Sequence, residues 1–184
     1  MATTKSLASD ALMQDIAASL HRIADALAQR EHPLGFGPSP GRRFVFVNRR
    51  QGYNWYHLGH DGSPMPITEP AISGYVCGLE LSQVQRNGQD VAKLRLHLRA
   101  DQHYVLESGA QTVFSKGLVC ALARLTPDDL LEPLTIEPQA AENGEVLFAR
   151  VYRHGEPVYA PWEDTTDFGR LTQQAMEIVA AAQR

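Results

Sequence analysis

One stretch of the sequence places basic side chains at alternate positions. In VAKLRLHLRAD, which begins at Val91, the residues Lys93, Arg95, His97 and Arg99 alternate with alanine or leucine. Successive side chains of a β-strand point to opposite faces, so this stretch predicts a strand with one buried and one cationic face. Cations at every second residue lie about 6.6–7 Å apart, which roughly matches successive phosphates of an extended strand. The spacing favours binding of a polyanion, and the competing interpretation is a solvated β face.

A second group of basic residues stands beside aromatic ones. The segment RRFVFVNRRQGYNWYHLG predicts two strands, Phe44–Val47 and Tyr53–Leu58, separated by a turn at Arg50–Gly52. Aromatic rings that stack on nucleobases contribute roughly 1–3 kcal/mol per base. Alternation in this segment does not decide which face is wet, and most aromatic residues of a small barrel are core. The candidate binding residues here are Arg42, Arg43, Arg49, Arg50, Tyr53, Tyr56 and, foremost, Trp55, which lies beside four arginines; Tyr104 is a further candidate.

Charge is distributed unevenly along the chain. The 184 residues carry a net charge of −4, which by itself argues against a nucleic-acid partner. However, residues 41–125 hold 10 Lys and Arg against 6 Asp and Glu, whereas residues 126–184 hold 4 against 11. Because association is steered by local potential, the basic middle of the chain is compatible with an anionic ligand.

Other kinds of chemistry have little support. The sequence has no glycine-rich phosphate loop, nucleophile elbow or zinc-hydrolase helix motif, so neither an enzyme nor a cofactor is expected. His57 and His60 have no cysteine partners, and we expect no metal site. Cys77 and Cys120 each fall in an apolar element and are expected to be buried free thiols in a reducing compartment. No apolar run is long enough to cross a bilayer and no export signal is recognisable, so we expect a cytoplasmic protein without membrane contact.

The elements that would position the basic strand follow a regular order from Ile72 onward. Residues 72–85 predict a long strand, in which Gly74 and Gly78 indicate a bulge or bend. Asn87–Gly88 is a hairpin turn signal. The expected elements after that turn are strands 91–99 and 103–107, a helix within residues 112–126, strands 134–139 and 145–153, and an amphipathic helix over residues 166–183.

The order β-β-β-α-β-β is that of an OB-fold, a five-stranded Greek-key barrel with one helix between its third and fourth strands. Residues 72–159 also resemble the OB-fold cores of phage and bacterial single-stranded DNA-binding proteins. The resemblance rests on GYVCGLELSQVQRNGQDVAKLRLHLRA, YVLESG, FSKGLVCAL, PLTIEP and VLFARVY. It covers about half the chain. It implies a mainly β protein whose barrel is flanked by an N-terminal helix, a β-hairpin and a C-terminal helix.

Three regions follow from these patterns. Residues 1–31 contain a helix at 7–31 whose stripe of Ile16, Leu20, Ile23 and Leu27 packs on its own domain or forms an oligomeric seam. Residues 32–41 are a Pro/Gly-rich linker. Residues 42–184 form the OB-fold domain with its preceding hairpin and its C-terminal helix.

The leading hypothesis is a sequence-tolerant single-stranded DNA-binding protein, with homo-oligomerisation expected. Binding would combine phosphate neutralisation with aromatic stacking in an OB-fold groove, and RNA is a possible ligand of the same groove. The alternative is a protein–protein interaction module in which the barrel is a scaffold and the end helices mediate assembly.

Overall fold

The chain divides into two compact units, residues 1–39 and 40–184. The computed structural model describes residue 16 and residues 19–20, 41–50, 52–86, 88–142 and 144–184, without the side chains of Arg50 and Arg86. In the first unit the described residues are helical, and the side chains of Ile16 and Leu20 are exposed. The rest of the predicted N-terminal helix, and the predicted linker up to residue 40, lie outside the described residues.

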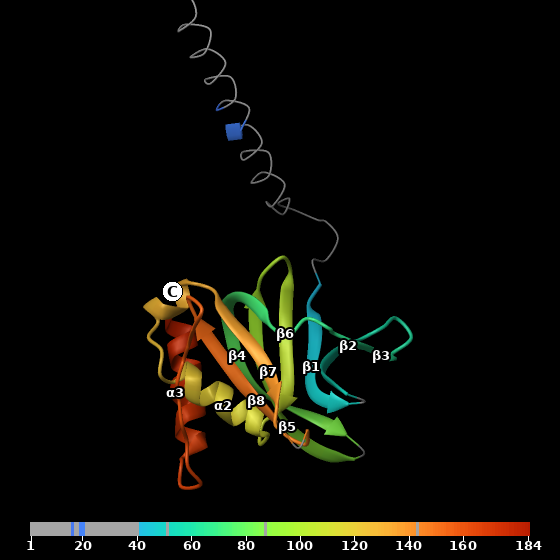
Figure 1. Ribbon diagram of the computed structural model, residues 1–184. Coiled ribbons are helices and arrows are strands. Elements are labelled where there is room, and N and C mark those ends of the chain that lie inside the picture. The colour runs from blue at the N-terminus through green and yellow to red at the C-terminus, as the bar shows by residue number, and fades with distance from the viewer. Residues whose placement is uncertain (1–15, 17–18, 21–40, 51, 87, 143) are drawn as a thin grey trace, which may run out of the picture. The chain divides into compact units, whose positions relative to one another are not determined.

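In the described part of the second unit, the strands form one mixed sheet in the order β3-β2-β1-β6-β5-β4-β7-β8-β9 (Figure 1). The strands are β1 (Arg43–Arg50), β2 (Tyr53–Leu58), β3 (Pro64–Pro66), β4 (Ile72–Arg86), β5 (Gln89–Arg99), β6 (His103–Gly109), β7 (Leu134–Ala140), β8 (Leu147–Arg153) and β9 (Glu156–Pro157). The helices are α2 (Val113–Leu122), the 3-10 helix η1 (Asp128–Leu131) and α3 (Phe168–Ala181). The prediction of a mainly β protein with flanking helices is confirmed.

Strand β4 serves two parts of the sheet. Its first residues, Ile72 to Gly74, pair with β7, and the strand pairs with β5 from Tyr75 onward. The register with β5 shifts between Val76 and Gly78, where a bulge was predicted from the glycine. This bend carries one continuous strand from the β5–β6 ladder to the β7–β8 ladder.

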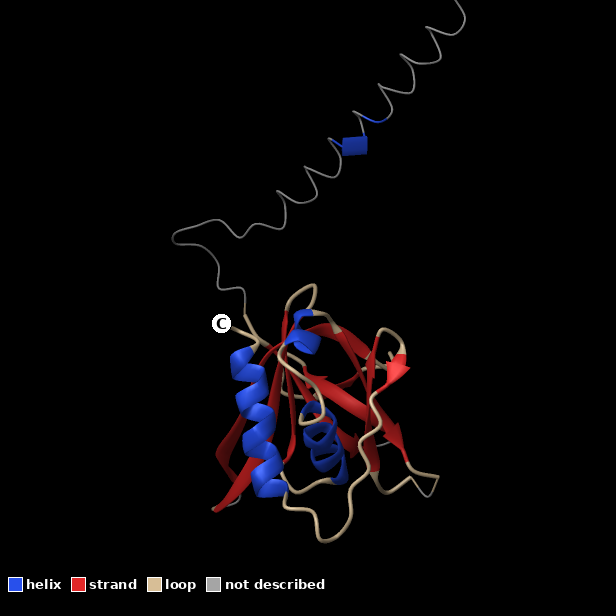
Figure 2. Ribbon diagram, turned by 90° about the vertical axis from the view of Figure 1, so that its left-hand side faces the viewer, coloured by secondary structure: helices blue, strands red, loops and turns tan. Residues whose placement is uncertain are grey.

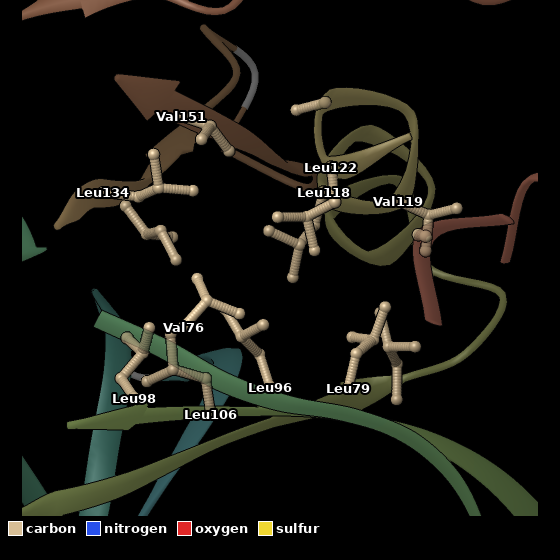
Figure 3. Close-up of a cluster of buried hydrophobic side chains, with 14 of the residues drawn as sticks. Val76, Leu79, Leu96, Leu98, Leu106, Leu118, Val119, Leu122, Leu134 and Val151 are labelled. Carbon is tan, nitrogen blue, oxygen red and sulfur yellow. The ribbon is translucent and has the colours of Figure 1, made fainter. Parts of the chain in front are cut away.

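The core lies between the leucine face of β5 and helix α2. Leu94, Leu96 and Leu98 are at most 2% exposed, and each such burial is worth about 1.5–3 kcal/mol. Leu118 and Leu122 of α2 point toward this face in Figure 3, with side chains of β7 and β8 completing the cluster. Helix α2 packs mainly against β8, and helix α3 packs against β4 and against α2, so the two helices lie side by side (Figure 2).

The hydrogen-bonded ladder is open and does not close into the predicted five-stranded barrel. Strand β1 pairs in parallel with the free edge of β6, with Val45 opposite Leu106, and extends the sheet through β2 and β3. Val45 and Val47 are buried while Phe44 is exposed. The alternating side chains of β1 therefore form one face toward the core and one toward solvent. No helix in the described part of the chain is long and apolar enough to span a membrane.

Candidate nucleic-acid interface

The two faces predicted for β5 are present. The leucines point into the core, and Lys93, Arg95, His97 and Arg99 occupy the opposite face. We call this side of β1, β2, β4, β5 and β6 the outer face. The predicted basic row therefore lies on the surface of the sheet, as the alternation in the sequence indicates.

Arg95 differs from its neighbours because carboxylates flank it on both sides. It stands opposite Glu80 of β4 and opposite Glu107 of β6 in the two ladders. Its Nε lies 2.9 Å from Glu107 Oε2, and its Nη1 lies 3.6 Å from Glu80 Oε1. The Glu107 side chain is only 9% exposed, so Arg95 compensates a largely buried charge. It adds no net positive charge to the outer face.

The remaining cations of the outer face are uncompensated. Neither Lys93 nor Arg99 forms an ion pair within the described residues. The Arg99 guanidinium lies over the Tyr75 ring, 5.8 Å from its centroid. Arg42 directly precedes β1, and the pKa of His103 is lowered by burial, then by His97 and by the charge of Arg42. Lys93, Arg99 and Arg42 are the groups available to an anion.

A row of four aromatic rings crosses the outer face of β1 and β2. The ring centroids of Phe44 and Phe46 are 6.3 Å apart, and those of Phe46 and Tyr56 are 5.4 Å apart. Tyr53 meets Tyr56 edge to face at 5.9 Å. At the other end, the Arg95 guanidinium lies 5.5 Å from the Phe44 centroid. We call Phe44, Phe46, Tyr56 and Tyr53 the aromatic row.

Three rings of the aromatic row and two cations of β5 share one groove of about 540 Å³. Phe44, Phe46 and Tyr56 line one part of it, and Lys93, Arg95 and Glu107 line another. The groove therefore offers ring faces and a positive charge side by side, across β2, β1, β6 and β5. Of the residues predicted from the sequence, Tyr56, Lys93 and Arg95 meet here, and Tyr53 contacts the Tyr56 ring from outside the groove.

Phe44 and Phe46 were not among the predicted site residues. In the segment FVFV they alternate with Val45 and Val47, so the sequence does indicate that the two phenylalanines share a face. Nothing local reveals that this is the exposed face, because that depends on the pairing of β1 with β6.

Several predicted residues lie elsewhere. Arg43 and Tyr104 line a separate pocket of about 500 Å³ on the side of β1 that carries the buried Val45. Arg43 donates to a ring nitrogen of His57 at 3.2 Å, and partial burial together with this arginine lowers the His57 pKa. Arg49 donates to Asn54 Oδ1 at 3.2 Å, and the side chain of Arg50 is outside the description.

Trp55, the foremost stacking candidate of the sequence, is a core residue. It is 3% exposed, and its indole N–H donates to the Glu69 carbonyl at 2.9 Å. Its ring offers no face to a ligand in this conformation, so Trp55 is not part of the outer face. The reason is the register of β2, in which Trp55 stands opposite the buried Val47 and Tyr56 stands opposite Phe46.

Trp55→Phe is therefore expected to lower the free energy of unfolding by about 1–2 kcal/mol, because the indole–carbonyl hydrogen bond is lost. The affinity for a single strand should stay the same. Urea unfolding and an anisotropy titration of one preparation measure both quantities. Loss of affinity without loss of stability would show that Trp55 contacts the ligand after all.

Two histidines form a hydrogen-bonded pair between the cations of the outer face. His97 Nδ1 lies 3.2 Å from His103 Nε2, and His97 Nε2 lies 3.4 Å from Glu80 Oε1. Cys77 Sγ is 3.9 Å from His103 Nε2. Burial, His97 and Arg42 all lower the pKa of His103, whereas burial raises the pKa of the Cys77 thiol. Within the described residues, no group of three or more potential ligands is arranged to hold a metal ion.

Comparison with known proteins adds no family to this description. No protein-family model matches the sequence, and neither a curated protein nor a solved structure matches it.

Proposed function

We propose that this chain is a sequence-tolerant single-stranded DNA-binding protein that uses the outer face of its sheet. The observation that supports this most is the aromatic row, which runs into the same groove as Lys93 and Arg95. Proteins that bind single strands without sequence preference combine stacking rings with cations that follow the backbone. Both components are present within one groove here.

The strand order supports the same proposal. Strands β6, β5, β4, β7 and β8 are adjacent in this order, and α2 lies between β6 and β7 along the chain. This order is compatible with the connectivity of an OB-fold core, although the sheet stays open and β1 pairs with the edge of β6. OB-folds bind oligonucleotides on the face of their second and third strands, to which β5 and β6 would correspond. The aromatic row extends that face onto β1 and β2.

The available charge predicts how the ligand is held. Lys93, Arg99 and Arg42 would neutralise phosphates, while Arg95 is held by Glu107 and Glu80. Rings stack on every base, so the groove would tolerate any sequence. The same chemistry accepts RNA, since recognition of RNA alone requires contacts to the 2′-hydroxyl.

The experiment that tests the proposal is an anisotropy titration of labelled oligo-dT between about 50 and 200 mM salt. Binding should weaken with salt, and Lys93→Ala/Arg99→Ala should flatten the slope of log K against log salt. Each phosphate contact on a single strand contributes about 0.7 to that slope, so the expected change is about 1.4.

Arg150→Ala/Arg170→Ala is the matched control, because it removes two exposed cations from β8 and α3. The net charge changes equally in both variants, but the control should keep the wild-type slope. Equal slopes in both variants would exclude a specific contribution of β5. Absence of binding by the wild type would favour the protein-interaction alternative, to which the mixed charges around Arg95 are better suited. A parallel titration with oligo-U compares RNA with DNA.

A further inference from the structure

We propose that single strands bind the outer face together with one proton, which is taken up by the His97–His103 pair beside the groove, so that affinity rises as the pH falls. The inference rests on the proposed function and adds a regulation of the same site. It starts from the position of the pair, which lies on the outer face among the cations expected to meet phosphates.

The hydrogen bond between the two rings limits how many protons the pair can hold. The contact between His97 Nδ1 and His103 Nε2, at 3.2 Å, requires one nitrogen to donate and the other to accept. One added proton is compatible with this arrangement, because a protonated His97 donates from Nδ1 to His103 and from Nε2 to Glu80. A second proton would place two donors face to face. The pair therefore takes up at most one proton in this geometry.

The backbone fixes His97 in this position. Gly78 stands opposite His97 in the β4–β5 ladder, and a side-chain carbon added to Gly78 would lie 3.3 Å from His97 Cδ2. The imidazole thus occupies the space that a larger residue would fill. His103 meets it from the start of β6, with the ring planes inclined by 62°.

Three arginines and two carboxylates surround the pair, so the net charge around it is slightly positive when no ligand is bound. Glu80 is the carboxylate in contact with the pair, and it is shared with Arg95. The charged and titratable groups around the pair are Glu80 and Cys77 on β4, Arg95 and Arg99 on β5, Glu107 on β6 and Arg42 before β1. A proton added to the pair meets this positive field, and the lowered pKa of His103 reflects it in part.

A bound phosphate backbone changes that field. Phosphates that approach Arg42 and Arg99 compensate one charge that acts on His103 and another that stands opposite His103 in the β5–β6 ladder, so the pair accepts a proton more readily in the complex than in the free protein. Because the pKa is higher in the complex, binding takes up a proton, and the affinity increases as the pH falls toward the pKa of the free protein. One proton limits this effect to tenfold per pH unit. We expect a total gain of about three- to tenfold between pH 7.5 and 5.5.

The direct test is calorimetry of the full chain with oligo-dT that has hydroxyl ends, since such a strand does not itself titrate near neutral pH. At about pH 6, close to the ordinary histidine pKa of about 6.5, the binding enthalpy is measured in buffers of different ionisation enthalpy. The slope of enthalpy against ionisation enthalpy gives the number of protons bound. We expect a fraction of one proton for the wild type, and none for His97→Gln/His103→Gln. His60→Gln, in an exposed loop, is the control and should behave as the wild type.

The outcomes separate this inference from the proposed function. Binding without proton uptake by the wild type overturns the inference and leaves the function in place. Uptake that persists in the double variant overturns it as well, because the proton then goes elsewhere. If the wild type does not bind oligo-dT, both fail together. The wild-type measurement needs no substitution, so a variant that folds poorly does not prevent a decision.

Discussion

Replacement of Arg95 by alanine is expected to lower the free energy of unfolding by about 2–3 kcal/mol. The substitution leaves the Glu107 carboxylate, only 9% exposed, without its partner at 2.9 Å. Breaking a buried pair by removing one member costs about 3–5 kcal/mol. Because the Arg95 side chain is 23% exposed, we expect a cost at or just below the lower end of that range. Urea unfolding followed by circular dichroism measures the effect. Arg95 is thus expected to act first as a structural residue.

Lys93→Ala is the matched control for this prediction. Lys93 lies two residues before Arg95 on the same face, but it has no ion-pair partner in the described part of the chain. Its removal should change the stability by less than about 0.5 kcal/mol. Arg95→Ala/Glu107→Ala should recover part of the loss, because the unpaired carboxylate is gone. Equal costs for Arg95→Ala and Lys93→Ala would contradict the assignment of the buried pair.

The two faces of β5 were predictable because the necessary information is local. Leucine recurs at every second position from Leu94 to Leu98, and the hairpin signal Asn87–Gly88 precedes the strand. Because side chains of a strand alternate between its two faces, all three leucines lie on the same face, and that face must be the one that packs in the core. The same reasoning placed Lys93, Arg95 and Arg99 on the outside, as the structure confirms.

The compensation of Arg95 was not predictable, since it depends on the register of three strands. Glu80 and Glu107 lie on opposite sides of Arg95 only because β4 and β6 pair with β5 in the observed registers. The sequence shows carboxylates at these positions, but a shift of one residue would turn them to the other face. A row of basic residues in the sequence is therefore not yet a row of free charges.

The place of β1 was the largest gap in the sequence analysis. Its pairing with β6 places Phe44 opposite Val105, although the two residues lie far apart in the sequence. Parallel strands are not joined by a tight turn, so the sequence contains no turn signal that would predict this contact. Without that contact the sequence favoured a closed barrel, and it made Trp55 the foremost stacking candidate while leaving the exposed face of β2 undecided. With it, Val45, Val47 and Trp55 enter the core, and Phe44 and Phe46 face outward.

Loss of the ring faces in the aromatic row is expected to weaken single-strand binding by about ten- to hundredfold. The variant is Phe44→Leu/Tyr56→Leu, which keeps apolar side chains on β1 and β2 but removes two stacking surfaces. Each base stacked on a ring contributes roughly 1–3 kcal/mol, and leucine retains part of the apolar contact. Anisotropy titration of oligo-dT at fixed salt measures the change, and urea unfolding checks that the stability is preserved.

Phe148→Leu is the control, because Phe148 is also an exposed phenylalanine on a strand, 41% exposed on β8, outside the aromatic row. It should bind as the wild type does. The salt dependence gives the sharper distinction: stacking releases no counterions, so Phe44→Leu/Tyr56→Leu should lower the affinity at every salt concentration without changing the slope. The Lys93→Ala/Arg99→Ala variant should do the reverse and change the slope. If the ring variant also flattened the slope, its rings would be positioning the cations, and the groove would bind its ligand through charge alone.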